Sequence, residues 1–215
     1  MIKKTDPYLK ARAYEVIKNK IVRCELKPGS ALSEKDLIEE IGASRTPIRE
    51  AISKLEEEHL LVVFPKKGIF VTEITIKDVI DIYAMRLIVE PYAARMAALR
   101  LDAGAVIPFR TLWAENHALV TAEEHVKADR DFHQIIARAT GNKYLIQTFS
   151  TLYNQASRIR MLSLLKIRKR QEEIRTEHLA LIEAILDRDE DEAEKCMKLH
   201  LTRARETALL VFPSF

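Results

Sequence analysis

Apolar residues recur at helical spacing along most of the chain, but the pattern changes character near residue 75. Up to that point, short apolar stretches alternate with turn residues such as Pro28, Gly29 and Gly42. Beyond it, long stretches repeat with a period near 3.6 residues and contain few helix breakers, which predicts long amphipathic helices. The change predicts two domains, at residues 1–75 and 76–215.

The first domain combines short helices with a hairpin. Two apolar runs, 60–64 and 69–72, flank the turn sequence Pro-Lys-Lys-Gly at 65–68, and this pattern predicts two strands. Ser33 is a good N-cap for the second helix, and Gly42 ends that helix. The three helices are expected at residues 7–24, 33–42 and from Ser44 or Thr46 onward. This order of elements, with the hairpin last, is that of a winged helix-turn-helix.

The second domain has helical periodicity throughout. Breaks in the pattern near Asp102, Thr121, Gly141 and Arg188 help to separate six expected helices. These span residues 77–101, 103–120, 122–140, 142–165, 168–188 and 189–211. Six such helices can bury a sizeable core as one bundle. The predicted fold class is therefore mainly α, with an N-terminal winged helix-turn-helix and a C-terminal all-helical bundle.

Composition narrows the class of protein. Hydrophobic residues make up 47% of the chain and charged residues 31%, which excludes a disordered or collagen-like chain. A net charge of +3 argues neither for nor against the binding of nucleic acid. Cys24 and Cys196 lie far apart without CxxC spacing, so neither a disulfide framework nor a Cys-based zinc site is expected. Free Cys residues favour the cytoplasm. No apolar run reaches the ~20 residues of a membrane span, and the first residues lack the apolar core of a signal peptide.

The third helix carries residue types that read DNA. Arg45 and Arg49 lie four residues apart near its N-terminus, and Arg pairs bidentately with guanine in the major groove. Hydroxyl groups beside the helix N-terminus and ammonium groups at the hairpin tip are suited to phosphate contacts. These groups belong to Ser44, Thr46, Lys66 and Lys67. The alternative is a small helical domain whose Arg side chains are merely solvated, because several Glu residues share that helix.

The chain resembles the GntR family of bacterial transcription regulators in residues 26–37, 42–51, 55–61 and 65–71. The most specific part is Ser-Arg-Thr-Pro-Ile-Arg-Glu-Ala, which begins at Ser44. The resemblance implies that the two Arg residues read bases, while the hydroxyl residues and the wing contact the DNA backbone. Many members have Arg where this chain has Lys35, and Lys keeps the charge but loses the planar guanidinium. The predicted DNA-binding residues are Lys35, Ser44, Arg45, Thr46, Arg49, Lys66, Lys67 and Gly68.

Three His residues and an Asp form a second constellation, in the helical domain. Asp129 lies four residues before His133, so the two side chains share a helix face, and His178 and His200 lie on apolar stripes of later helices. Burying these groups without partners is costly, and a shared zinc, nickel or manganese ion would satisfy all four. The alternative is that each His is separately hydrogen-bonded in the core. The remaining His residues are expected at the surface or in structural roles: His59, His117 and His125.

The helical domain resembles the FCD ligand-binding domain of FadR-type GntR regulators. The matching stretches are residues 85–95, 129–142, 177–185 and 193–200. In that group, Asp-x-x-x-His followed by two later His residues marks the metal-binding members, which implies the ligand set Asp129, His133, His178 and His200. The acyl-CoA-binding member lacks this triad, so an acyl-CoA effector is disfavoured. Six helices rather than seven resemble the vanillate-regulator (VanR) subgroup.

The resemblance also implies an effector. In such members the effector is usually a small carboxylate, an organic or sugar acid that completes the coordination of the metal. Arg86, near the middle of the first bundle helix, is the candidate partner for a second carboxylate of the effector. The alternative is that Arg86 forms a surface salt bridge with Glu90. Arg158 and Arg160 are weaker candidates of the same kind.

We therefore expect a transcription regulator, a repressor, that binds double-stranded operator DNA as a homodimer and is not an enzyme. A small organic or sugar acid would bind at the metal site and loosen DNA. Two alternatives belong to other classes. A metal-dependent hydrolase would need a general base, and no spare Glu or Asp is clearly placed as one. An architectural DNA-binding protein would keep the metal only for stability.

Overall fold

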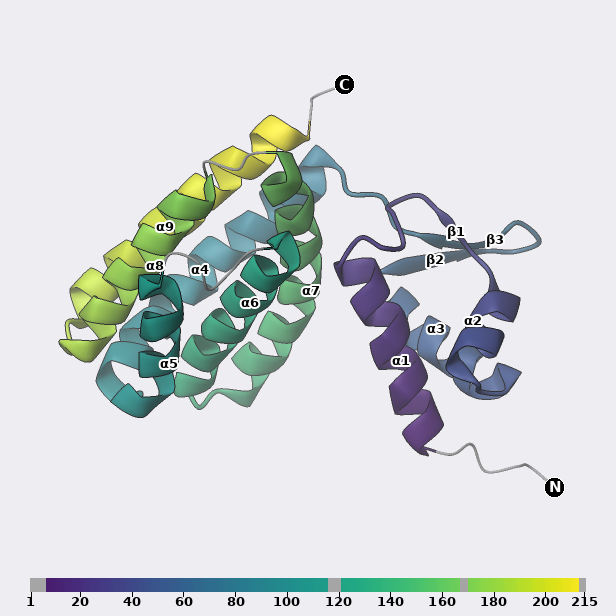
Figure 1. Ribbon diagram of the computed structural model, residues 1–215, viewed down its shortest axis with the longest axis horizontal. Coiled ribbons are helices and arrows are strands. Elements are labelled where there is room, and N and C mark those ends of the chain that lie inside the picture. Colours follow the sequence, from purple (N-terminus) through teal and green to yellow (C-terminus); the bar gives the residue numbers. More distant parts are fainter. Residues whose placement is uncertain (1–6, 116–120, 167–169, 213–215) are drawn as a thin grey trace. The chain divides into compact units, whose positions relative to one another are not determined.

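The computed structural model describes residues 7–115, 121–166 and 170–212. The chain divides into two compact units, Met1–Ile74 and Thr75–Phe215, each with its own hydrophobic core. We call them the winged unit and the helical unit, and we describe each by itself. Helices form most of both units, and one small sheet lies in the winged unit (Figure 1). The predicted fold class, mainly α with a winged helix-turn-helix, is thereby confirmed.

The winged unit contains three helices and a three-stranded antiparallel sheet among its described residues. The sheet has the strand order β1-β3-β2, so β3 lies in the middle and β2–β3 is the predicted hairpin. The elements are α1 (Pro7–Val22), β1 (Ala31–Leu32), α2 (Glu34–Ile41), α3 (Arg45–Glu57), β2 (Leu61–Phe64) and β3 (Gly68–Val71). The sequence pattern did not predict β1. A strand of two residues carries no periodicity, and it exists because Ala31 and Leu32 pair with Phe70 and Ile69 of β3.

Local signals define the turn between α2 and α3. The Ser33 side chain accepts a hydrogen bond from the backbone N–H of Asp36, which caps the start of α2 as its residue type predicts. Gly42 ends α2 with a left-handed backbone, φ 69°, and its N–H donates to the Ile38 carbonyl. Ser44 occupies the N-cap position of α3 without a capping hydrogen bond from its side chain. The turn therefore sets α3 against α1, with Ile17 and Ile48 fully buried in the core.

The helical unit contains six helices among its described residues. They are α4 (Ile76–Arg100), α5 (Ala103–Ala114), α6 (Ala122–Ala139), α7 (Lys143–Lys166), α8 (Arg170–Leu186) and α9 (Glu190–Val211). Each lies within a few residues of its expected position, because capping residues such as Thr75, Thr121 and Asp189 begin the helices. Residues 116–120 and 168–169, expected to be helical, lie outside the described residues.

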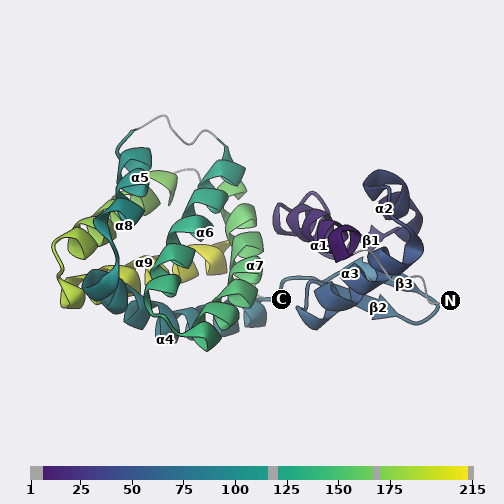
Figure 2. The ribbon, with the colours of Figure 1, turned by 90° about the horizontal axis from the view of Figure 1, so that it is seen from below.

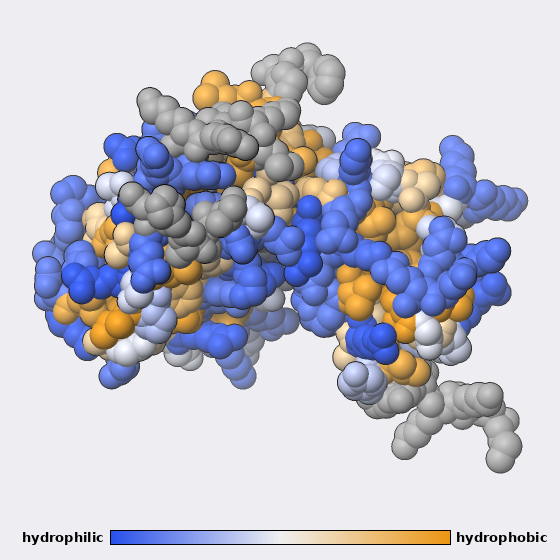
Figure 3. All heavy atoms as spheres, in the orientation of Figure 1, coloured by the Kyte–Doolittle hydropathy of each residue, from blue (hydrophilic) through white to orange (hydrophobic). Residues whose placement is uncertain are grey.

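The largest apolar cluster described in this unit joins α4, α5, α6, α8 and α9, and a smaller cluster of Ala137, Phe149 and Tyr153 joins α6 to α7. α4 lies along α9, and α6 packs against both α4 and α7 (Figures 1 and 2). The core includes Trp113, Phe132, Leu181 and Met197. No helix of the described residues is long and apolar enough to span a membrane. Hydrophilic residues cover most of the face drawn in Figure 3, with hydrophobic residues showing between them.

Candidate DNA-binding face and metal centre

The eight residues predicted to bind DNA are all exposed in the winged unit. Lys35 lies in α2, and Ser44 is the N-cap of α3, whose first turns hold Arg45, Thr46 and Arg49. Lys66 and Lys67 lie in the β2–β3 turn, and Gly68 begins β3. A groove of about 570 Å³ runs between α3 and this turn, and its lining includes Arg49, Lys66 and Gly68. The tertiary structure therefore brings α3, the predicted base-reading helix, and the β2–β3 wing onto one groove, although the two are distant in sequence.

An acidic residue that sequence reasoning missed also lines this groove. Glu34 lies next to both Arg side chains that are predicted to read bases: its Oε1 is 2.9 Å from Arg49 Nε, and its Oε2 is 3.8 Å from Arg45 Nε. The two Arg side chains are nonetheless mostly exposed, at 64% for Arg49 and 71% for Arg45. Exposed pairs of this kind contribute only ~0–1 kcal/mol, so both guanidinium groups can leave Glu34 for another partner.

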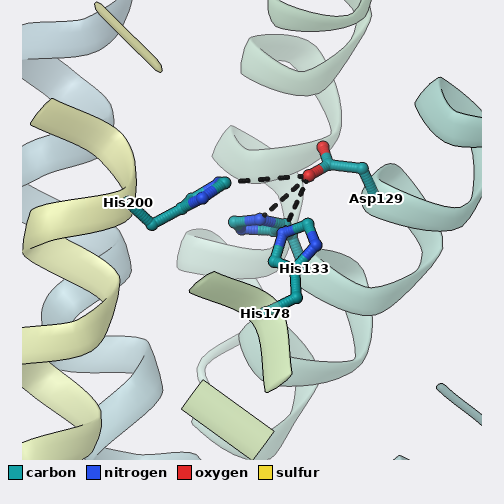
Figure 4. A group of neighbouring side chains, drawn as sticks. All are labelled: Asp129, His133, His178 and His200. Carbon is teal, nitrogen blue, oxygen red and sulfur yellow. Dashed lines mark ion pairs between the residues drawn. The ribbon is translucent and has the colours of Figure 1, made fainter. Parts of the chain in front are cut away.

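The four predicted metal ligands converge in the helical unit, although they come from three helices (Figure 4). Asp129 and His133 lie on α6, His178 on α8 and His200 on α9. Asp129 Oδ1 lies 3.1 Å from Nε2 of His178, 3.4 Å from Nε2 of His133 and 4.0 Å from Nε2 of His200. One ligand atom from each residue lies within 4.8 Å of the other three, and all four residues are buried.

The atoms that face one another in this cluster lack hydrogen-bonding partners. Among the described residues, none donates to or accepts from Asp129 Oδ1 or the Nε2 atoms of His133, His178 and His200. Burial lowers the pKa of all three imidazoles, which favours the neutral form that a metal ion requires. Three neutral imidazole nitrogens and one carboxylate oxygen are a donor set that suits zinc, nickel or manganese. The residues present therefore fit a divalent metal.

Two further carboxylates orient two of the imidazoles. His133 Nδ1 lies 2.6 Å from Glu90 Oε2, and His200 Nδ1 lies 2.8 Å from Glu177 Oε2. Each neutral imidazole can donate its Nδ1–H to the carboxylate, which leaves the Nε2 lone pair facing the cluster. Sequence reasoning did not assign this role to either Glu, because the bonds join residues 43 and 23 positions apart.

Both carboxylates are themselves held by Arg residues. Glu90 Oε1 accepts from Arg86 Nε at 2.5 Å, and Glu90 Oε2 accepts from the Tyr153 hydroxyl at 2.8 Å. Burial raises the pKa of Glu90, but Arg86 and His133 lower it more, so the net pKa is well below its usual range. Glu177 accepts two hydrogen bonds from Arg170, at 2.6 and 2.7 Å. Both carboxylates thus accept hydrogen bonds from a guanidinium as well as from an imidazole.

Arg160 and Trp113 complete the surroundings of the cluster. Arg160, from α7, forms an ion pair with Oδ2 of Asp129, the oxygen that does not face the imidazoles. Burial lowers the pKa of Arg160 to about 9, which leaves its guanidinium charged at neutral pH. Trp113 packs against His178 with 4.2 Å between ring centroids and the ring planes tilted by 34°. It is the single Trp of the chain, and its fluorescence can therefore report on the cluster.

The other candidate residues lie as follows. Arg86 is buried at 2% exposure, so its ion pair with Glu90 is an interior pair and not the surface salt bridge that the alternative describes. Its role in effector binding stays a prediction. Arg158 is also buried, and donates to Gln155. His59 lies at a turn with a left-handed backbone, His125 is partly buried in α6, and His117 lies outside the described residues.

Comparison with known protein families decides the class of protein. The family described as "Bacterial regulatory proteins, gntR family" matches residues 9–71, and the FCD domain matches residues 81–203. The second match alone covers more than half of the chain. This chain belongs to the GntR family, with an FCD domain. It is a DNA-binding transcription regulator and not an enzyme, as the sequence predicted.

Similar proteins with regulator names match most of this chain. An HTH-type transcriptional regulator of Streptomyces ambofaciens is 31% identical over 202 residues, which cover 91% of this chain and 80% of that protein. The HTH-type transcriptional repressor RspR of Escherichia coli K12 is 26% identical over 197 residues, 90% of this chain and 86% of that one. A GntR regulator structure from Rhodococcus sp. RHA1 has a TM-score of 0.84 at 21% identity, covering 95% of this chain and 99% of its own, which supports the fold.

Proposed function

We propose that this GntR regulator is a homodimeric repressor whose operator binding is controlled by a small carboxylate bound at a metal site in the helical unit. The observation that carries the proposal is the buried cluster of one Asp and three His residues, whose facing atoms lack hydrogen-bonding partners among the described residues. A shared divalent ion would satisfy all of these atoms together.

The DNA-binding part of the proposal assigns roles along the groove of the winged unit. Arg45 and Arg49 would read base edges in the major groove, because their guanidinium groups are exposed on α3. The hydroxyls of Ser44 and Thr46, together with Lys35, would contact phosphates. The wing residues Lys66, Lys67 and Gly68 would contact the backbone of a flanking groove. Repression, as the direction of control, is supported by the relative named as a transcriptional repressor in Escherichia coli.

The metal part assigns Asp129, His133, His178 and His200 as ligands, with zinc as the first ion to test. When bound, such an ion supplies a Lewis-acidic anchor for a carboxylate oxygen of the effector. Glu90 and Glu177 would keep the imidazoles of His133 and His200 in the metal-binding tautomer. An Arg beside the site would pair with the effector, Arg86 by the sequence-based prediction.

Dimer formation is supported by the outer face of α4. This helix exposes large apolar side chains that its own unit does not cover: Ile80, Met85, Ile88, Tyr92 and Leu99. Exposed apolar patches of this kind often form protein interfaces. A two-fold dimer would present two reading helices to a pseudo-palindromic operator. An effector controls DNA binding only if it binds the DNA-competent and DNA-incompetent dimers with different affinity.

The test begins with zinc calorimetry on chelator-stripped protein. One tight site per chain is expected, with quenching or a shift of Trp113 fluorescence, and both should be lost in a His178→Ala/His200→Ala variant. A gel-shift titration of operator DNA with small carboxylates should then release DNA from the zinc-loaded protein only. If no tight zinc site is found, the metal part of the proposal is wrong. If every acid that binds makes the protein bind DNA more tightly, the repressor part is wrong.

A further inference from the structure

His178 differs from the other two imidazoles of the cluster in how its ring is held. The Nδ1 atoms of His133 and His200 lie 2.6 and 2.8 Å from the carboxylates of Glu90 and Glu177. Neither ring nitrogen of His178 has a hydrogen-bonding partner among the described residues, although the side chain is buried. A buried N–H group without an acceptor is unfavourable. No hydrogen bond therefore fixes the orientation of this ring.

Aromatic packing holds the His178 ring instead. Trp113, from α5, lies on one side of it, with 4.2 Å between ring centroids, and Phe132, from α6, lies at 5.3 Å. Trp113 and Phe132 also contact each other edge to face, at 4.9 Å. Trp113 thus positions a proposed metal ligand although it is not a ligand itself, and its own position depends on α5.

The helix α5 is the shortest of those described in the helical unit, with 12 residues. It packs against α6 and α8 (Figure 1). Two of its residues, Gly104 and Pro108, weaken a helix. Because Pro108 has no N–H group, the carbonyl of Gly104 lacks the hydrogen bond that a regular helix would give it. The internal hydrogen bonds of α5 therefore hold it less firmly than those of a regular helix would.

One Arg side chain links the C-terminal end of α5 to α8. Arg175, on α8, donates hydrogen bonds to the backbone carbonyls of Trp113 and Ala114. A second link, between Arg110 of α5 and Glu183 of α8, joins two side chains that are 53% and 47% exposed, so it holds α5 only weakly. We call the bonds of Arg175 to the two carbonyls the α5 clamp.

The helices α4 and α7 are tied to the cluster by buried carboxylates. From α4, Glu90 contacts His133 of α6 and accepts a hydrogen bond from Tyr153 of α7. From α7, Arg160 forms an ion pair with Asp129 of α6. Moving either helix would separate a buried carboxylate from its partners, which is costly. Moving α5 would break aromatic contacts and the α5 clamp, but no buried ion pair that the structure shows.

All four proposed ligands are buried, so an ion can reach them only when part of the helical unit moves. We propose that α5 is the gate of the metal centre: the α5 clamp of Arg175 keeps it closed, and Trp113 holds His178 in place while it is closed. This inference rests on the proposed metal site and specifies how an ion enters and leaves. Because Arg175 is not a ligand, loosening the clamp should speed zinc entry and zinc release together.

The experiment measures zinc exchange on the full-length protein by stopped flow. Release begins when zinc-loaded protein meets an excess of a chelator whose absorbance changes as it takes up zinc. Entry begins when metal-free protein meets zinc, and Trp113 fluorescence reports it. In Arg175→Gln both rates should rise about fivefold or more, because two bonds from a charged donor are lost. The zinc affinity, measured by calorimetry, should change by less than about twofold, since both rates rise together.

Two further variants of Arg residues calibrate this result. Arg175→Lys keeps the charge but cannot span both carbonyls with a planar fork, so its rates should be intermediate. Arg100→Gln is the matched control, because Arg100 of α4 also donates to a carbonyl at the end of a helix, that of Thr140 in α6, at 3.1 Å. This control loosens a helix that carries two proposed ligands and leaves the α5 clamp intact, so both rates should stay at the native values.

Substitutions of Trp113 test whether it positions His178. Trp113→Phe keeps an aromatic ring beside the imidazole and should keep most of the zinc affinity. Trp113→Leu removes that ring and should lower the affinity about tenfold, as loss of a group that orients a metal ligand does. Chelator absorbance replaces the lost fluorescence in both variants. Denaturant unfolding of the metal-free variants measures their stability separately, and equal zinc affinity in the two variants would show that Trp113 has no positioning role.

Hydrogen exchange tests the gate without any metal. Backbone amides of residues 103–114 should exchange faster in metal-free Arg175→Gln than in the metal-free native protein, whereas those of α6 and α8 should not. Native zinc rates or native α5 exchange in folded Arg175→Gln would show that α5 is not the gate, and the proposed metal site would stand. If no variant and no native protein binds zinc, the metal part of the proposed function is wrong and this inference fails with it.

Discussion

The same chemical pair, an Arg with a Glu, occurs in both units with opposite consequences. In the winged unit Arg49 lies 2.9 Å from Glu34, and the two side chains are 64% and 24% exposed. In the helical unit Arg86 lies 2.5 Å from Glu90, and the two side chains are 2% and 0% exposed. Distance hardly distinguishes the two pairs. Exposure does, because water and salt weaken the first pair and are excluded from the second.

This difference indicates how each unit uses its Arg residues. An exposed guanidinium gives up its carboxylate at little cost, so Arg49 can leave Glu34 for the DNA contact that we propose. A buried guanidinium cannot, because separation would leave two unmatched charges inside the protein. Arg86 holds Glu90, which in turn contacts His133, whereas the base-reading role that we propose falls to the exposed Arg49. Four substitutions test this contrast, beginning with the largest expected effect.

Arg86→Ala should destabilise the helical unit by ~3–5 kcal/mol, because it leaves Glu90 buried without its cation. The measurement is denaturant unfolding of metal-free protein, followed by circular dichroism. The control is Arg110→Ala, which breaks an exposed pair with Glu183 and should change stability little. If Arg86→Ala lowers the stability as little as Arg110→Ala does, the buried pair and the exposed pair do not differ in the way described above.

Arg49→Ala should weaken operator binding by ~1–3 kcal/mol per half-site and relax the sequence preference, because a base contact is lost. Fluorescence anisotropy with operator and scrambled DNA measures both effects. Lys67→Ala is the comparison, since loss of a phosphate contact should weaken all sequences about equally and reduce the salt dependence. Identical sequence profiles for the two variants would contradict the division into reading and positioning residues.

Glu177→Gln should lower zinc affinity by about 10- to 100-fold, because the amide orients His200 less strongly and removes a charge near the ion. Competition with a chelator of known affinity measures the change. Glu183→Gln, on the same helix but paired at the surface with Arg110, supplies the matched control. Equal zinc affinity in Glu177→Gln and the native protein would show that this carboxylate has no part in the metal centre.

Glu34→Gln should strengthen DNA binding by about two- to fivefold at low salt, the smallest effect of the four. The substitution removes a negative charge beside Arg45 and Arg49 and frees both from an exposed ion pair. The affinity for scrambled DNA should rise at least as much as the affinity for operator DNA. The preference for the operator sequence should therefore stay the same or fall. Glu39→Gln makes the same charge change at an exposed position of α2. If both variants gain equally, general charge and not the pairing with Arg explains the effect.

Local chemistry explains which features could be predicted. Ser33 and Gly42 bound α2 because capping depends on a few neighbouring atoms, and the long periodic stretches gave each bundle helix within a few residues. The set of Asp129, His133, His178 and His200 was also predictable, because Asp129 shares a helix face with His133 and because His178 and His200 lie on apolar stripes, where a lone polar side chain is costly to bury. Glu177 gave no such signal, although it is adjacent to His178.

The sequence by itself determined the helical pattern, the winged order of elements, the family and the four clustered residues, because these depend on local spacing and on residue chemistry. Only the tertiary structure decided which charges are buried together. Arg86 meets Tyr153 across 67 positions, and Asp129 meets Arg160 from another helix. Whether such an Arg is fixed in place or free to bind a ligand depends on how much water surrounds it, and water is excluded by packing between segments that are distant in the chain.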